Sequence, residues 1–272
     1  MRVSTTGWRA VLTAFLVTAW SAGATAQTAL SREAQAAFLQ SARIVSSKDI
    51  SKGVTRPVRL TLSDGTLTHD AAFSAVNEQV GIMKYKDGRT ELNFVDSYKY
   101  TLAAYRLAGM LGIDDMMPVT VERTVGAHKG ALTWWVDDVK FDEGERVKQN
   151  VPPPDLDAWN RQLLRMRLFA QLIADTDRNT GNILITNDWK LWMIDFTRAF
   201  RRSRQLMVPG SMTRCDRAVV EKLRGLTKES VTEQTRPFIN AGDVDALMAR
   251  RDAILALVDK LVADNGEAKV LY

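Results

Sequence analysis

Three oxygen-bearing side chains in one short segment could together hold a divalent cation, namely Asp177, Asn182 and Asp195. Carboxylate and amide oxygens are ligands that Mg²⁺ and Mn²⁺ prefer, and phosphate oxygens of a substrate usually complete the set. Phosphoryl transfer uses such a cation together with a separate carboxylate that orients or deprotonates the attacking hydroxyl. We therefore interpret Asp195 as the main metal ligand, Asn182 as a second ligand and Asp177 as the catalytic base.

A predicted β-hairpin brings Asn182 towards Asp195. Residues 183–186 and 189–194 are rich in strand-forming types, and the Asn-Asp pair between them is typical of a turn. Pairing across this turn would place Asn182 opposite the residues just before Asp195. Asp177 lies on the preceding loop, which follows a helix whose broad apolar face indicates deep burial. The three side chains are therefore expected to converge.

Three prolines at residues 152–154 separate a strand-like part of the sequence from a helical part. One helix interrupts the strand-like part, beginning after a capping residue, Asp96 or Ser97, and ending at Gly112. The rest of that part alternates apolar and polar residues or runs apolar, with many β-branched and aromatic types. This pattern predicts strands over 58–62, 71–76, 119–123 and 131–136.

Two long helices are predicted after the prolines, one carrying residues 159–173 and one over 243–263, because apolar residues recur in both at helical spacing. The whole pattern predicts an α+β, bilobal fold. We expect a small β-rich N-lobe over 27–140 and a larger helical C-lobe over 141–272.

The spacing of the acidic residues resembles that of protein kinases. Asp177, with Asn182 five residues later, is similar to their catalytic loop, and Asp195 followed by Phe196 resembles their metal-binding position. The local sequence Asp-Arg-Asn-x-Gly-Asn is most similar to atypical kinases: the secretory-pathway Golgi casein kinases, the HipA toxin kinases and the phosphatidylinositol kinases. The resemblance implies a bilobal protein-kinase-like fold that uses Mg²⁺ or Mn²⁺ with ATP or another nucleotide.

Upstream residues extend this resemblance. Gly53, within the sequence Gly-Val-Thr-Arg-Pro, resembles the nucleotide-covering loop of the secretory kinases, and the helix that ends at Gly112 resembles helix C. The resemblance also implies a small-lobe lysine that contacts nucleotide phosphates and a helix C acid that pairs with it. Ser74 stands where the lysine is expected, and Thr101 where the acid is expected.

Four residues are the candidate cofactor-binding positions: Gly53, Lys84, Lys86 and Arg178. The two lysines are the nearest substitutes for the missing small-lobe lysine. Arg178, next to the expected base, is also a candidate for holding the catalytic loop against its neighbours. Thr197 replaces the glycine that commonly follows the Asp-Phe pair in kinases.

The N-terminus has the layout of a secretory signal peptide. Arg2 and Arg9 precede an apolar run over 10–20, and small residues lead up to Ala26, after which we expect cleavage. The apolar run is shorter than the ~20 residues that a transmembrane helix needs, so a stable membrane anchor is not predicted. We therefore expect an exported protein, periplasmic or secreted.

Composition excludes several function classes. The chain has 37 basic and 32 acidic residues, two of the basic ones in the leader, and this mild excess does not predict nucleic-acid binding. Cys215 is the only cysteine, so no intrachain disulfide can form. With two histidines, His69 and His128, the usual zinc spacings are absent, and both histidines are expected to be ordinary surface residues. No feature of the sequence predicts an oligomeric state.

Several residues have two interpretations. The arginines at 198, 201, 202 and 204 could attract an acidic or phosphorylated substrate, or could form a solvated charged run. Asp175 could be a further metal ligand or could cap the preceding helix. Trp134 and Trp135 could line an adenine pocket or belong to the core.

Three hypotheses about function follow from these observations. The first is a phosphotransferase that modifies a hydroxyl on an exported protein, glycan or lipid headgroup. Its partner would be an exported substrate that is acidic or carries a hydroxyl. The second is a pseudokinase that binds metal or nucleotide without transfer. The third is a structural envelope protein that uses the acidic loop as a calcium staple.

Overall fold

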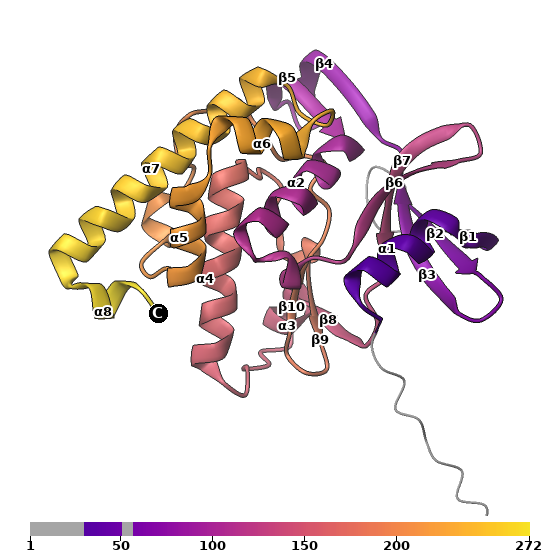
Figure 1. Cartoon of the computed structure of the whole chain (residues 1–272), viewed down its shortest axis with the longest axis horizontal. Helices are drawn as coiled ribbons and strands as arrows, with labels where there is room; N and C mark the ends of the chain where they lie inside the picture. The colour runs from indigo at the N-terminus through magenta and orange to yellow at the C-terminus, as the bar shows by residue number, and fades with distance from the viewer. Residues whose placement is uncertain (1–29, 51–56) are drawn as a thin grey trace, which may run out of the picture. The chain divides into compact units, whose positions relative to one another are not determined.

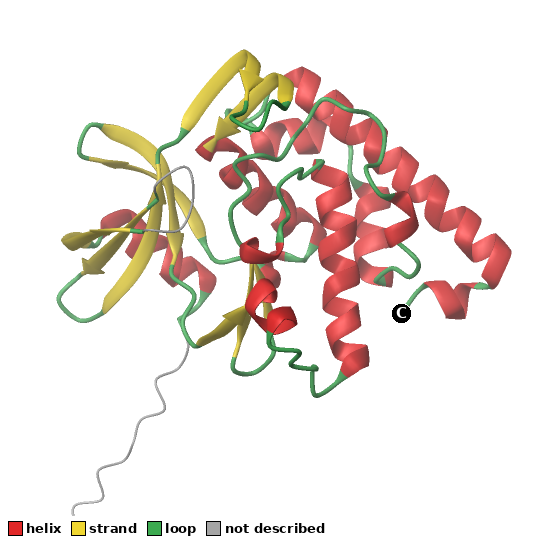
Figure 2. Cartoon of the chain, turned by 180° about the vertical axis from the view of Figure 1, so that it is seen from behind, coloured by secondary structure: helices red, strands yellow, loops and turns green. Residues whose placement is uncertain are grey.

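The computed structural model describes residues 30–50 and 57–272. Residues Ser31–Tyr272 form one compact unit. The predicted signal peptide, residues 1–26, and the candidate Gly53 lie outside the described residues. Within the compact unit, Figure 1 shows a β-rich part and a helical part, with α2 between them, and Figure 2 shows the same division by secondary structure. The predicted α+β, bilobal class is confirmed.

The first part is built on a five-stranded antiparallel sheet with strand order β1-β2-β3-β7-β6. Its strands are β1 Arg43–Asp49, β2 Val58–Ser63, β3 Thr68–Ser74, β6 Thr120–Val125 and β7 His128–Trp134. The helix α1 (Arg32–Ser41) packs Phe38 and Leu39 into the core of this sheet. The four predicted strands are all present, although β3 and β7 each begin three residues earlier than predicted. Neither α1 nor β1 was predicted.

A second, two-stranded sheet lies outside this five-stranded sheet. It consists of β4 (Asn77–Lys84) and β5 (Thr90–Ser97), which pair as a hairpin and were not predicted. Almost every residue of β4 is exposed, which explains the missing apolar alternation that strand prediction requires.

Helix α2 (Tyr98–Leu111) follows β5 directly and confirms the helix predicted to begin after Asp96 or Ser97 and to end at Gly112. The Ser97 hydroxyl accepts a hydrogen bond from the Lys99 amide, and Gly112 ends the helix with φ of 66°, a conformation that glycine adopts at little cost. Most of its side chains lie in the core shared with the helical part. This shared core joins the two parts.

The helical part contains the two predicted long helices, α4 (Leu156–Ile173) and α7 (Ala241–Asn265). Asp155 and Asn240 cap their first turns through side-chain acceptors, and α7 begins two residues before the predicted start. Shorter helices complete this part: α3 Glu143–Lys148, α5 Arg217–Gly225, α6 Lys228–Thr235 and α8 Glu267–Val270. None of the helices among the described residues is long and apolar enough to span a membrane.

A three-stranded antiparallel sheet with order β10-β9-β8 packs beside α4 and carries the residues of interest. It contains β8 (Val139–Asp142), β9 (Ile183–Thr186) and β10 (Leu191–Met193). The predicted lobe boundary at residue 140 falls inside β8, whose pairing partner β9 belongs to the helical part.

Candidate active site

The candidate catalytic loop begins where α4 ends. Ala174 leaves the helix in the left-handed conformation, with φ of 47°, and its amide donates back to the last turn. The following residue, Asp175, has a fully buried side chain whose Oδ1 accepts from the Asp177 amide at 3.2 Å. The loop is therefore folded back on itself by a buried carboxylate. Oδ1 accepts from the Asp177 amide and Oδ2 accepts from Arg178, so Asp175 is an ion-pair partner within the loop rather than the free carboxylate that a further metal ligand would offer.

Arg178 joins the catalytic loop to the hairpin. Its Nε and Nη2 donate to Asp175 Oδ2 at 2.9 and 2.5 Å, and its Nη1 donates to the Asn182 and Ile194 carbonyls at 2.8 and 2.6 Å. Nη2 also donates to the Asp195 carbonyl at 3.1 Å. These bonds use every N–H of the guanidinium. Arg178 is therefore a positioning residue, with no donor left for the nucleotide contact that the sequence predicted.

Asn182 lies against the backbone of Asp177. Its Nδ2 donates to the Asp177 carbonyl at 2.9 Å, so its Oδ1 points away from that carbonyl and accepts no hydrogen bond from the described residues. The Asn179 amide group donates to Asp177 Oδ1 at 3.0 Å, which restricts the rotation of that carboxylate. Asp177 is exposed, whereas Asn182 is half-buried.

The predicted hairpin is present, with Ile183 opposite Met193 and the Ile194 amide donating to the Asn182 carbonyl at 3.1 Å. Its turn is longer than predicted. Residue 189 was expected to begin the second strand, but Trp189 lies in the turn with φ of 62°, and β10 begins at Leu191. The register still brings Asn182 beside the chain that leads to Asp195.

Asp195 has a backbone conformation that non-glycine residues rarely adopt. Its φ is 54°, in the left-handed region, which costs about 1 kcal/mol or more for an L-residue. The Thr197 hydroxyl and amide donate to its Oδ1 at 2.9 and 3.3 Å. Oδ2 accepts no hydrogen bond from the described residues, and Asp195 is exposed. The turn thus directs a carboxylate oxygen outward, away from the packed chain.

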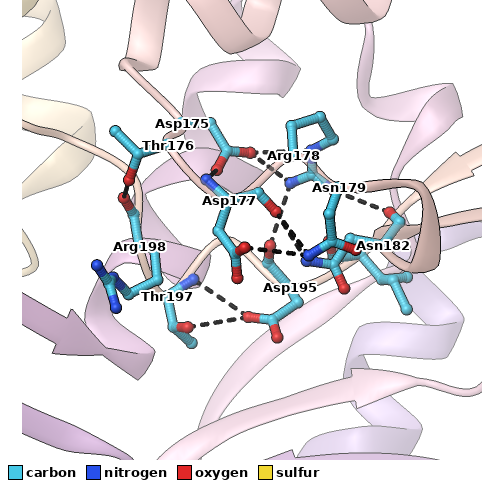
Figure 3. A network of polar contacts seen from close by, with 10 residues as sticks. Asp175, Thr176, Asp177, Arg178, Asn179, Asn182, Asp195, Thr197 and Arg198 are labelled. Carbon is cyan, nitrogen blue, oxygen red and sulfur yellow. Dashed lines mark hydrogen bonds and ion pairs between the residues drawn. The ribbon is translucent and has the colours of Figure 1, made fainter. Parts of the chain in front are cut away.

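Figure 3 shows Asp177, Asn182 and Asp195 in one polar network, with both carboxylates on the same side of it. No three His, Cys, Asp or Glu side chains among residues 30–50 and 57–272 come together as a metal site. A cation here would therefore rely on Asp195, the Asn182 amide oxygen and oxygens of a bound substrate. That donor set fits Mg²⁺ or Mn²⁺, which bind few protein carboxylates when phosphates are present.

The fold is similar to solved atypical kinases. A structure of hydra Fam20 with sugar superposes with a TM-score of 0.66 at 13% identity, covering 88% of this chain and 91% of that chain. The Golgi casein kinase with Mn/ADP bound gives 0.62 at 13% identity, covering 88% and 78%. Another Golgi casein kinase structure gives 0.60 at 13% identity, covering 88% and 77%.

The chain has an atypical protein-kinase-like fold. No protein-family model and no curated protein matches the sequence. At this level of identity the structural likeness establishes the kinase-like fold alone, and any activity depends on the residues of the loop and the hairpin.

Ser74 and Thr101, which the sequence analysis expects where kinases carry a lysine and an acid, are both uncharged. Ser74 ends β3 with its hydroxyl buried and without a hydrogen-bond partner, and Thr101 is buried in α2. Lys84 and Lys86 are exposed at the tip of the β4–β5 hairpin. Among the described residues, no hydrogen bond or ion pair joins either lysine to the network around Asp195.

Asp96 is an acid near this site that the sequence interpretation considered only as a helix cap. It lies at the end of β5, is 8% exposed, and its Oδ1 is buried without a hydrogen-bond partner among the described residues. Burial raises the pKa of Asp96, and the nearby negative charge of Asp195 raises it further. The adjacent Ser97 amide donates to the Thr197 carbonyl at 2.9 Å. This bond holds the start of α2 against the Asp195 turn.

Arg198 and Arg201, just beyond Asp195, share one carboxylate. Glu91 of β5 accepts a hydrogen bond from Arg198 Nη2 on its Oε2 at 2.6 Å, and its Oε1 lies 2.7 Å from Arg201 Nη2. Glu91 Oε2 also accepts from the Tyr85 hydroxyl. These two arginines are therefore largely buried ion-pair partners. They are not free to attract an acidic or phosphorylated substrate, and they do not belong to a solvated charged run.

Arg250 of α7 is a second residue that the sequence interpretation missed. It is fully buried, and its guanidinium donates to the Leu172 and Arg201 carbonyls, each at 2.8 Å, and to the Ser203 carbonyl. It ties the end of α4 to the loop after Asp195. Its spacing from Leu247 and Ile254 was the available signal, because it places an arginine on the apolar face of α7.

His69 is not the ordinary surface residue that we predicted. Its ring stacks on Trp134 with centroids 3.8 Å apart and bonds to the Asp137 carboxylate at 2.7 Å. Trp134 also packs edge-on against Phe38, so the core interpretation of this tryptophan applies. Trp135 lies under the Arg59 guanidinium. These contacts secure the connection between β7 and β8.

Proposed function

We propose that this chain is an exported kinase-like phosphotransferase that transfers a phosphoryl group from a nucleotide to a hydroxyl of a protein, glycan or lipid headgroup. One observation carries the proposal. Asp177, Asn182 and Asp195 lie in a single network that Arg178 holds together through five hydrogen bonds. A buried arginine satisfied in this way fixes two loops relative to each other, and such preorganisation is what phosphoryl transfer requires.

Each residue has a distinct part in this proposal. Asp195 and Asn182 would hold Mg²⁺ or Mn²⁺, and the bound cation would neutralise charge on the phosphates. Asp177 is free of that cation and can accept the proton of the attacking hydroxyl. The Asn179 amide group, bonded to Asp177 Oδ1, orients the carboxylate for that transfer. The manganese and ADP in the similar Golgi casein kinase structure support this choice of cofactors.

A second candidate function is that of a pseudokinase, which binds metal or nucleotide without transfer. The uncharged Ser74 and Thr101 favour it, because the resemblance to kinases implies a lysine and a paired acid at these positions. A calcium staple, the third hypothesis, requires an oxygen-rich site and no nucleotide.

Thermal melting of the purified protein, with and without Mg²⁺ or Mn²⁺ and ATP, distinguishes these functions. We expect stabilisation by metal and nucleotide together, at about 2–3 kcal/mol when the ligand concentration is ~100 times Kd. Asp195→Asn should abolish this stabilisation. The matched control Asp264→Asn, at an exposed acid of α7, should retain it. Stabilisation by calcium alone would instead support the staple.

Phosphate transfer from radiolabelled ATP separates the two kinase-like candidates. Asp177→Ala should still be stabilised by metal and nucleotide but should lose transfer by about 100-fold or more, since it removes the base. Stabilisation without any transfer by the wild-type protein would favour the pseudokinase. If neither wild-type stabilisation nor transfer occurs, the site assignment is wrong.

A further inference from the structure

The β4–β5 hairpin is an unusually exposed element. It forms a sheet of its own, and all residues of β4 except Met83 are exposed. Figure 1 shows β4 on the side of the pair that faces away from the helices. A two-stranded hairpin is marginally stable by itself, so an exposed one needs support from elsewhere in the protein.

That support comes from contacts at both ends of the hairpin. At its base, the Ser97 hydroxyl donates to Asn77 Oδ1 at 2.7 Å. Near its tip, Glu91, which lies opposite Met83, forms ion pairs with the two arginines that follow Asp195. Because these contacts are made by β5 and by the first residue of β4, they leave the outer edge of β4 unoccupied by any described element. The hairpin is thus held in place while one strand edge stays open.

One face of the hairpin is apolar and the adjoining tip is basic. Ile82 and Leu92 are directly opposed across the strands, at 59% and 68% exposure, and Val80 lies on the same face two residues before Ile82. Lys84 continues this face towards the tip. Neither Lys84 nor Lys86 has an acidic partner within 4.0 Å among the described residues.

Gly81 in the middle of β4 favours the approach of another backbone. A Cβ at this position would meet no atom within 4 Å, so the glycine is not required by packing inside the protein. Glycine within a strand often marks a place where another backbone comes close. The opposite strand, β5, is less regular, because Asn93 has a positive φ of 52°.

We propose that the open edge of β4 binds an extended segment of a partner protein by strand addition. Main-chain hydrogen bonds to β4 would supply affinity, and alternate side chains would supply specificity. On the exposed face, the partner would place apolar residues beside Val80 and Ile82 and an acidic residue beside Lys84. No hydrogen bond or ion pair among the described residues joins Val80, Ile82 or Lys84 to Asp177 or Asp195, so the proposal does not depend on transfer activity.

A labelled peptide tests this proposal by fluorescence anisotropy with the full chain. The probe is an eight-residue peptide in which valine, isoleucine and two glutamates occupy alternate positions and threonine occupies the others. It is synthesised with this sequence and with the reversed sequence. We expect saturable binding in at least one direction. Ile82→Asp should weaken it by about tenfold or more, because it adds a charge to the apolar contact. Leu156→Asp, a matched change at a site of 63% exposure, should leave it unchanged.

Two further controls identify the mode of binding. A peptide in which proline replaces a threonine near the centre should not bind, since proline removes a main-chain donor. Replacing the glutamates with lysines should abolish binding to the wild type and restore it in Lys84→Glu. Equal binding of the proline or lysine peptide to the wild type would overturn the proposal. Binding to vesicles of anionic lipid, without binding to either peptide direction, would also overturn it.

Discussion

The candidate catalytic loop with its hairpin and the small-lobe side of the candidate site differ in how their polar groups are paired. Every N–H of the Arg178 guanidinium donates a hydrogen bond, either to its buried ion-pair partner Asp175 or to a backbone carbonyl. On the small-lobe side, the Ser74 hydroxyl and Asp96 Oδ1 are buried without partners among the described residues. The difference indicates that the half of the candidate site around Arg178 is preorganised, whereas the half around Ser74 and Asp96 has buried polar atoms without partners.

Arg178→Ala should have the largest effect, because it removes one member of a buried ion pair and leaves Asp175 uncompensated. We expect the free energy of unfolding to fall by about 3–5 kcal/mol in urea denaturation. Arg161→Ala is the matched control, since it removes an exposed Arg–Asp pair on α4, and it should cost less than about 1 kcal/mol. Similar losses in both variants would show that the Arg178 network is not specially stabilising.

Glu91→Gln should have a smaller effect, because it breaks the link between the hairpin and the arginines after Asp195. Burial raises the pKa of Glu91, but the Tyr85 hydrogen bond and the charges of Arg201 and Arg198 lower it more, so the net direction is downward. We expect a loss of about 2 kcal/mol at neutral pH.

The pH dependence of this loss provides its control. Because the folded-state pKa is depressed, the stability from Glu91 is present above the ordinary pKa of 4.5 and is lost as the pH falls through the folded value. Wild type and variant should therefore converge in acid during denaturation at several pH values. A difference that persists at low pH would contradict the ion-pair explanation.

Asp96→Asn should have the smallest effect, and in the opposite direction. Burial raises the pKa of Asp96, so the folded protein loses stability as the pH rises above the ordinary value of 3.8 and through the folded pKa. The amide avoids a buried charge and should raise the free energy of unfolding by about 1 kcal/mol at pH 7.

Denaturation of the Asp96→Asn variant across pH checks this prediction. The gain should vanish in acid, where the wild-type carboxyl is neutral. Lower stability of the variant at pH 7 would mean that the carboxylate has a favourable role that burial does not reveal.

The sequence by itself determined the elements that depend on neighbouring residues. Helix α2 begins after Ser97 and ends at Gly112, and both ends could be predicted because capping is a local interaction. The Asn-Asp turn predicts the hairpin because turn chemistry acts over a few residues. The three candidate site residues could be found for the same reason, since they lie within one segment. The bounds of β3, β7 and β10 were less accurate, because strand ends depend on pairing partners.

Only the tertiary structure decided which charges meet. Glu91 and Arg198 are 107 residues apart in the chain, and Arg250 bonds to a carbonyl 78 residues away. No local pattern encodes such pairs, since they depend on how separately formed elements pack. For the same reason the exposed placement of Lys84 and Lys86, the burial of Asp96 and the open edge of β4 followed from packing. Local spacing specified the candidate site, and long-range contacts set its charge environment.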